Sequence, residues 1–291
     1  MSTLIFHHGA LGDGVLIWPL LRALVPCTLI GPREKVRLAQ AQIPGVDALD
    51  GDSPDFSRLF APAAEAEVSD HVRELLGGAG RVISFISNGR DAWSDNVRRM
   101  APQARCVFIQ PHPSSDRVEP IARFHLRQLL EQGIDVDPVM PAARMNPDGP
   151  VVVHPGSGGR DKCWPTERVE ALLCHLRGIG RPSAVIIGEV ERERVATDVI
   201  DRWERLAELI EPASLMELAR AIGAASVYVG NDSGPTHLAA QLGVTTIALF
   251  GPTDPRVWTP VGPRVRVLWP GETAAMDWLP VEAVAEAIAC G

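Results

Sequence analysis

Lysine is scarce in this chain, and acidic residues outnumber basic ones. Lys35 and Lys162 are the only lysines. The 36 acidic residues exceed the 28 lysines and arginines, giving a formal net charge of -8. Proteins that bind duplex nucleic acid usually present a basic face, so no nucleic-acid partner is expected. Because lysine is so rare, a lysine inside a glycine-rich loop is informative.

The chain also lacks paired cysteine motifs and long apolar runs. Its five cysteines are an odd number without a C-x-x-C pair, which argues against a zinc site or a disulfide framework. They are interpreted as reduced thiols of a cytoplasmic protein. The sequence shows neither a signal peptide nor a run of about 20 apolar residues that would span a membrane. Any contact with the inner membrane surface is therefore expected to be peripheral.

Strand, loop and helix patterns alternate in both halves of the chain. An apolar run at 4–6 leads through a glycine-rich turn at 9–14 into a helical pattern at 15–24. Prolines punctuate residues 135–150, and a second such unit follows. The sequence predicts an α/β fold with two Rossmann-like, doubly wound domains facing across a cleft, residues 1–140 and 141–291. Ligands are expected beyond the carboxyl ends of the strands.

The remaining elements are predicted from apolar periodicity. Strands are expected at 27–30, 81–86, 106–109, 151–153, 184–187, 227–229 and 245–250. Helices are expected at 33–42, 166–177, 192–209, 214–224, 235–242 and 281–289, with Thr166 as the N-cap of the second.

The loop at 154–162 contains three glycines, a serine and the rare lysine. Gly156, Gly158 and Gly159 let the backbone approach a ligand closely. Exposed N–H groups in such a loop form an anion-binding nest, to which Ser157 adds a hydroxyl and Lys162 a positive charge. The spacing matches neither the P-loop nor the Rossmann fingerprint. A diphosphate site and an ordinary flexible turn are both open interpretations.

The loop at 230–237 lies between a predicted strand and a predicted helix. Free N–H groups at the start of that helix would favour an anion. Ser233 and Thr236 offer hydroxyls to a phosphate or a sugar, and His237 lies within reach of the same site. The alternative is that Asp232 and Ser233 only cap the helix and that the histidine is structural.

The turn at 9–14 contains one carboxylate, Asp13, at the start of a predicted helix. A helix cap is the interpretation that spacing alone favours. The alternative is a general base presented at the mouth of the cleft.

Taken together, these segments resemble glycosyltransferase family nine, which contains the ADP-heptose:lipopolysaccharide heptosyltransferases. The matching stretches are Gly9-Ala10-Leu11-Gly12-Asp13 with Pro19 and Leu24; His154-Pro155-Gly156-Ser157-Gly158 with Lys162 and Trp164-Pro165; and Gly230 to Ala240 with Phe250 to Pro255. Their occurrence in this order, in both halves, makes chance an inadequate explanation.

The resemblance implies a GT-B fold and an inverting transfer without a catalytic metal or cofactor. Residues 1–140 would bind the acceptor and residues 141–291 the nucleotide-sugar donor. The expected reaction moves heptose from ADP-heptose to lipopolysaccharide or another glycan or lipid-linked acceptor. The resemblance assigns Asp13 as general base in an acceptor-side loop with Gly9 and Gly12, and Lys162 to the leaving diphosphate. The donor residues it implies are Gly156, Ser157, Gly158, Lys162, Glu191, Asp232, Ser233, Gly234 and His237.

Three other functions remain as alternatives. A non-catalytic sugar-nucleotide-binding paralogue would keep the donor site without transfer. A nucleotide-sugar epimerase of the same fold would need further acid and base residues at the sugar. A Rossmann oxidoreductase is disfavoured because no G-x-G-x-x-G follows the first strand.

Overall fold

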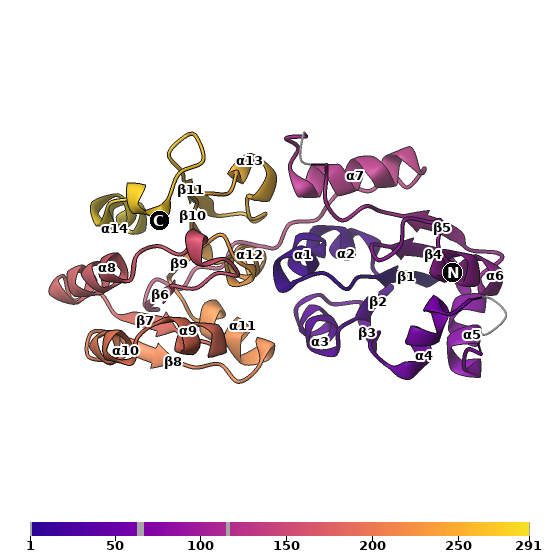
Figure 1. Cartoon of the computed structure of the whole chain (residues 1–291), viewed down its shortest axis with the longest axis horizontal. Helices are drawn as coiled ribbons and strands as arrows, with labels where there is room; N and C mark the ends of the chain where they lie inside the picture. The colour runs from indigo at the N-terminus through magenta and orange to yellow at the C-terminus, as the bar shows by residue number, and fades with distance from the viewer. Residues whose placement is uncertain (1, 63–66, 115–116, 291) are drawn as a thin grey trace. The chain divides into compact units, whose positions relative to one another are not determined.

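The computed structural model describes residues 2–62, 67–114 and 117–290. The chain forms two compact units, Met1–Val139 and Met140–Gly291 (Figure 1). Each unit contains one open sheet of parallel strands with helices on both faces. The predicted α/β, doubly wound architecture is confirmed. Among the described helices, none has the length and apolar composition needed to cross a bilayer.

The sheet of the first unit has five parallel strands. In spatial order they are β3(Val46–Asp50), β2(Cys27–Gly31), β1(Ser2–Phe6), β4(Ala79–Ser84) and β5(Arg105–Phe108). The strand order reverses between β1 and β4. In open α/β sheets ligands bind at such a reversal, outside the carboxyl ends of the strands. The turn that contains Asp13 follows β1 and therefore lies at this point.

Helices cover both faces of this sheet (Figure 1). They are α1(Leu11–Leu16), α2(Trp18–Leu24), α3(Arg33–Gln42), α4(Pro54–Ser57), α5(Asp70–Gly77), α6(Ala92–Met100) and α7(Ile121–Glu131), with the 3-10 turn η1(Arg58–Phe60). Under α5 and α6 the core is aromatic: Phe6 meets Trp93 edge to face, with 4.9 Å between ring centroids. Such pairs stabilise a core beyond the area that they bury.

The helix predicted at 15–24 is in fact two helices, α1 and α2, divided at Ile17. Pro19 has no backbone N–H to donate, and it lies in the first turn of α2, where that loss costs nothing.

The second unit has a six-stranded parallel sheet. Its order is β11(Val265–Leu268), β10(Thr245–Leu249), β9(Val227–Asn231), β6(Val151–His154), β7(Ser183–Ile186) and β8(Glu208–Ile210). The order reverses between β6 and β9. The two glycine-containing loops singled out from the sequence follow these two strands, so the topology places both at the expected ligand site.

The second sheet is also covered on both faces (Figure 1). Helices α8(Thr166–Gly178), α10(Thr197–Glu204) and α14(Val281–Ala289) share one apolar core with the sheet. Helices α11(Leu215–Gly223) and α12(Gly234–Gln241) pack against each other, and α12 contacts β9 and β10. The short elements are α9(Glu189–Arg194), α13(Pro255–Trp258), η2(Arg160–Lys162) and η3(Met276–Trp278). Because β6, β9 and β10 are buried along their whole length, they show continuous apolar runs.

Two predictions about this unit are wrong in detail. The single helix expected at 192–209 is α9, α10 and strand β8, because the backbone turns extended at Val195 and Ala196 and a three-residue strand has no readable alternation. Thr166 is the first residue of α8 rather than its N-cap, a position that Pro165 occupies. The sequence analysis also missed strands β8 and β11 of this unit and strand β3 of the first unit.

Candidate functional site

The loops that follow β6 and β9 are held together by one buried amide. Asn231 is 1% exposed. Its Nδ2 donates to the carbonyl oxygen of Pro155 at 2.7 Å, and its Oδ1 accepts from the backbone N–H of Trp164 at 3.0 Å. A buried amide with both ends bonded fixes the geometry around it. Asn231 thereby fixes both ends of the glycine-rich loop against β9.

Asp232 lies where the two loops meet. Lys162 Nζ donates to Asp232 Oδ2 at 2.8 Å, and His237 Nε2 lies 3.9 Å from Asp232 Oδ1. Ser157 Oγ donates to the Asp232 carbonyl oxygen at 2.7 Å. The structure therefore brings together four of the residues predicted for the donor site. The Asp232 carboxylate is nearly buried, while 32% of the Lys162 side chain remains exposed and accessible to an anion.

Glu191 reaches the same loop from α9. Its Oε2 accepts from the Gly188 N–H at 2.8 Å, and its Oε1 lies 3.8 Å from His154 Nε2. Burial lowers the pKa of His154, and the Glu191 carboxylate opposes that shift. Gly156 lies directly against Glu191, so the carboxylate occupies space that any larger side chain would need.

This contact gives a prediction with a control in the same loop. A Cβ on Gly156 would lie 1.7 Å from Glu191 Oε1, whereas one on Gly158 would meet nothing within 4 Å. We expect Gly156→Ala to destabilise the protein by about 2 kcal/mol or more, because Glu191 must move and lose its bond to Gly188. Gly158→Ala should change stability by less than about 0.5 kcal/mol. Urea unfolding measures both, and equal effects would contradict the contact.

Arg194 is a site residue that the sequence analysis missed. Its Nη1 donates to the Ser157 carbonyl oxygen at 2.8 Å, and its Nη2 to that of Gly158 at 3.3 Å. It follows Glu191 by three residues, so both side chains project from one face of α9. That spacing is the signal that could have identified it.

A pocket of about 200 Å³ lies beside these residues. Its lining includes Gly156, Ser157, Arg160, Trp164, Glu191 and Arg194. The pocket combines apolar walls with a few polar groups, as small-molecule sites do.

The start of α12 does not support the capping alternative for Asp232 and Ser233. Ser233 occupies the N-cap position, but its side chain accepts no hydrogen bond from the described backbone of α12. Its Oγ instead pairs with Thr236 Oγ1 at 3.2 Å. Thr236 donates to the Asn231 carbonyl oxygen at 2.5 Å, and Gly234 is the first residue of the helix.

Asp13 lies in the first turn of α1, in the first unit. Its Oδ2 accepts from the Ala10 N–H at 3.0 Å, so it does close the helix start, as spacing suggested. Its Oδ1 lies 3.2 Å from Nε2 of His112, a partner that the sequence did not reveal. The carboxylate keeps 22% of its side-chain area exposed. The cap and the general base are therefore compatible interpretations.

Glycine is required at the start of this turn. A Cβ on Gly9 would lie 2.7 Å from Asp13 Cβ. The Gly9 carbonyl oxygen accepts from Lys35 Nζ at 2.7 Å, which ties the turn to α3. Gly12 is the second residue of α1.

His7 supports the same turn and gives a pH-dependent prediction. Its Nδ1 accepts from the Gly9 N–H at 3.3 Å, a bond that a protonated ring cannot accept. Burial lowers the pKa of His7 from 6.5 to about 4, although nearby Asp13 opposes the shift. The unfolded chain therefore binds this proton at a higher pH than the folded protein, and stability falls as the pH drops from about 6.5 to about 4.

The expected loss from this group is about 3 kcal/mol over that range. Urea unfolding between pH 7 and 4 should show a smaller loss for His7→Gln than for the parent. Parallel curves for the two proteins would contradict the assignment.

In the described parts of the chain, no group of three or more histidine, cysteine, aspartate or glutamate side chains is arranged to hold a metal ion. That the reaction needs no catalytic metal ion stays a prediction, which an activity assay must test.

Comparison with known proteins identifies a family. The model described as Glycosyltransferase family 9 (heptosyltransferase) matches residues 126–280. Lipopolysaccharide heptosyltransferase 3 of Escherichia coli is 26% identical over 129 residues, which are 43% of this chain and 38% of that protein. The matched segment thus spans well under half of this curated relative.

Two solved structures resemble the whole chain. The glycosyl transferase family 9 structure from Veillonella parvula DSM 2008 has a TM-score of 0.75 at 18% identity, covering 99% of this chain and 96% of that one. The E. coli heptosyltransferase WaaC with ADP has a TM-score of 0.73 at 19% identity, covering 99% of each chain. At this identity the likeness shows the fold, and it confirms the GT-B type predicted from the sequence.

Proposed function

This chain belongs to glycosyltransferase family 9, and on that premise we propose that it is an inverting glycosyltransferase. The expected donor is ADP-heptose, and the expected acceptor is lipopolysaccharide or another glycan. The observation that carries the proposal is the convergence of Lys162, Asp232 and His237 with the glycine-rich loop at the β6/β9 edge.

The second unit would bind the donor. Lys162 and the loop N–H groups would contact the diphosphate, and Glu191 would accept from the ribose hydroxyls. The pocket between Trp164 and Arg194 would receive the nucleoside. The WaaC structure that contains ADP has the same fold, which supports a nucleoside diphosphate as the ligand.

The first unit would bind the acceptor and supply the base. Asp13 takes the proton of the acceptor hydroxyl as its oxygen attacks the anomeric carbon of the donor sugar. The bond from that carbon to the diphosphate oxygen breaks, and the electron pair leaves with the diphosphate. A single displacement of this kind inverts the anomeric centre. Lys162 and the loop N–H groups stabilise the developing negative charge, a task that a metal ion performs in other enzymes.

The proposed acceptor has a consequence for where the protein would act. A lipid-linked acceptor would require the protein to associate peripherally with the inner membrane surface. The cytoplasmic location expected from the sequence stays a prediction.

Binding and transfer assays test the proposal separately. A thermal-shift panel of ADP, UDP, GDP, ADP-heptose and NAD should give selective shifts with the two adenosine diphosphate ligands. Stabilisation by NAD alone would favour an oxidoreductase.

A transfer assay with ADP-heptose and a lipopolysaccharide acceptor should release ADP and give a product of inverted anomeric configuration. We expect the rate to be unchanged in EDTA. Donor binding without ADP release from any acceptor tested would favour the non-catalytic paralogue. Conversion of the sugar on the nucleotide, with no acceptor present, would favour the epimerase.

A further inference from the structure

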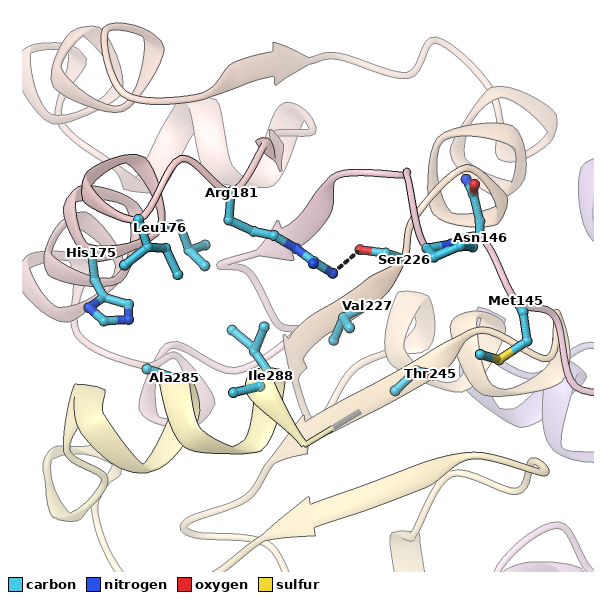
Figure 2. A pocket seen from close by; sticks show the side chains of 13 residues that line it. Met145, Asn146, His175, Leu176, Arg181, Ser226, Val227, Thr245, Ala285 and Ile288 are labelled. Carbon is cyan, nitrogen blue, oxygen red and sulfur yellow. Dashed lines mark hydrogen bonds between the residues drawn. The ribbon is translucent and has the colours of Figure 1, made fainter.

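A second and larger pocket, of about 420 Å³, lies in the second unit at the opposite edge of its sheet (Figure 2). Val227 and Thr245, the first residues of β9 and β10, line it. The candidate donor loops follow the carboxyl ends of the strands, whereas this pocket lies at the amino ends. It is therefore separate from the donor site.

The walls of this pocket are mainly aliphatic. Leu176 and Ile179 come from the end of α8, and Ile288 from the end of α14. Two apolar side chains in the lining, Met145 and Ile179, are each 64% exposed. The lining contains no phenylalanine, tyrosine or tryptophan, and its only aromatic ring is the His175 imidazole, so most of its surface offers van der Waals contact to an alkyl chain.

One cation lines this apolar pocket. The side chain of Arg181 extends to Ser226 (Figure 2), and its Nη2 donates to Ser226 Oγ at 3.2 Å. Its Nε is buried and has no hydrogen-bond partner among the described residues. No described carboxylate lies within 4.0 Å of the guanidinium. The guanidinium therefore has no described counter-ion, and an anion in the pocket would supply one.

We propose that this pocket binds an alkyl carboxylate, with its head group on Arg181 and its chain along the α8 and α14 wall. The guanidinium is a planar fork that matches a carboxylate through two parallel hydrogen bonds. A pocket of this volume falls within the range for small-molecule sites, and its few convergent polar groups would orient the head.

Calorimetric titration of the full chain with sodium decanoate tests the proposal. We expect saturable one-to-one binding with a Kd on the order of 10–100 µM. Octanoate should bind about tenfold more weakly, because it buries two fewer methylene groups. Arg181→Met should weaken decanoate binding at least about tenfold. Arg220→Met, which removes an exposed arginine of α11 outside the lining, should not change it.

A second variant keeps the test decisive if Arg181→Met does not fold. Ala289→Phe places a ring at the exposed rim of the pocket and should block decanoate. No saturable binding to the parent, equal affinity for decanol, or unchanged decanoate affinity in both pocket variants would each overturn the proposal. Titration of the same variants with ADP reports separately on the donor site, so failure here is distinct from failure of the proposed transferase function.

Discussion

Replacing Asp13 by asparagine should remove most sugar transfer and leave donor binding intact. Asparagine keeps the size of the side chain and can still accept from the Ala10 N–H, which lies 3.0 Å from Oδ2. It cannot take a proton from an acceptor hydroxyl. General-base catalysis is worth about 10²–10⁴-fold in rate, so we expect kcat to fall by that factor.

The measurement is a continuous assay of ADP release with a verified acceptor, beside calorimetry of ADP binding. Asp95→Asn is the matched control, since Asp95 lies on α6 of the same unit with its side chain 70% exposed. It should transfer at the parent rate. If Asp13→Asn also transferred at the parent rate, Asp13 would not be the base.

His112 offers a finer test of the same carboxylate. Its Nε2 lies 3.2 Å from Asp13 Oδ1, so it helps to orient the group that accepts the proton. We expect His112→Ala to lower kcat by roughly tenfold. A loss of that size corresponds to the free energy of about one charge-assisted hydrogen bond. ADP affinity should not change. A kcat equal to that of the parent would show that the Ala10 N–H alone orients Asp13.

The sequence indicated the two candidate donor loops because their signals are local. Glycines and a strand-loop-helix pattern lie together at 154–162 and again at 230–237, and the first of these loops also contains one of the two lysines. The topological rule that ligands bind where strand order reverses then places both loops at one edge, and the structure shows the reversal between β6 and β9.

The residues that the sequence did not reveal act over long separations. His112 pairs with Asp13 across 99 residues, and Arg194 reaches the Ser157 carbonyl across 37. Every residue has a backbone carbonyl, so the residue type of the acceptor does not reveal a hydrogen bond from an arginine to that carbonyl. Strand β8 was missed for another reason: three residues between helices are too few to distinguish from a helix end.

Lys162 is the second residue whose replacement should have a large effect. The chain contains two lysines, and only this one lies in the candidate donor site. We expect Lys162→Met to lower kcat by about 10²–10³-fold, since a donor aimed at developing charge contributes that much. ADP affinity should fall as well, because the ground-state diphosphate already carries negative charge. Calorimetry and the ADP-release assay measure the two effects.

The partner of Lys162 decides how this loss is interpreted. Its ammonium lies 2.8 Å from Asp232 Oδ2, and that carboxylate is almost buried. Without the lysine, the Asp232 carboxylate would lose its ammonium partner, repel a bound diphosphate and destabilise the loop. Combining Lys162→Met with Asp232→Asn removes that repulsion, so ADP affinity should partly recover while kcat stays low. Lys35→Met is the control, because Lys35 bonds Gly9 in the other unit and should not affect ADP binding. Full recovery of kcat in the double variant would show that Lys162 only neutralises Asp232 and does not stabilise the leaving diphosphate.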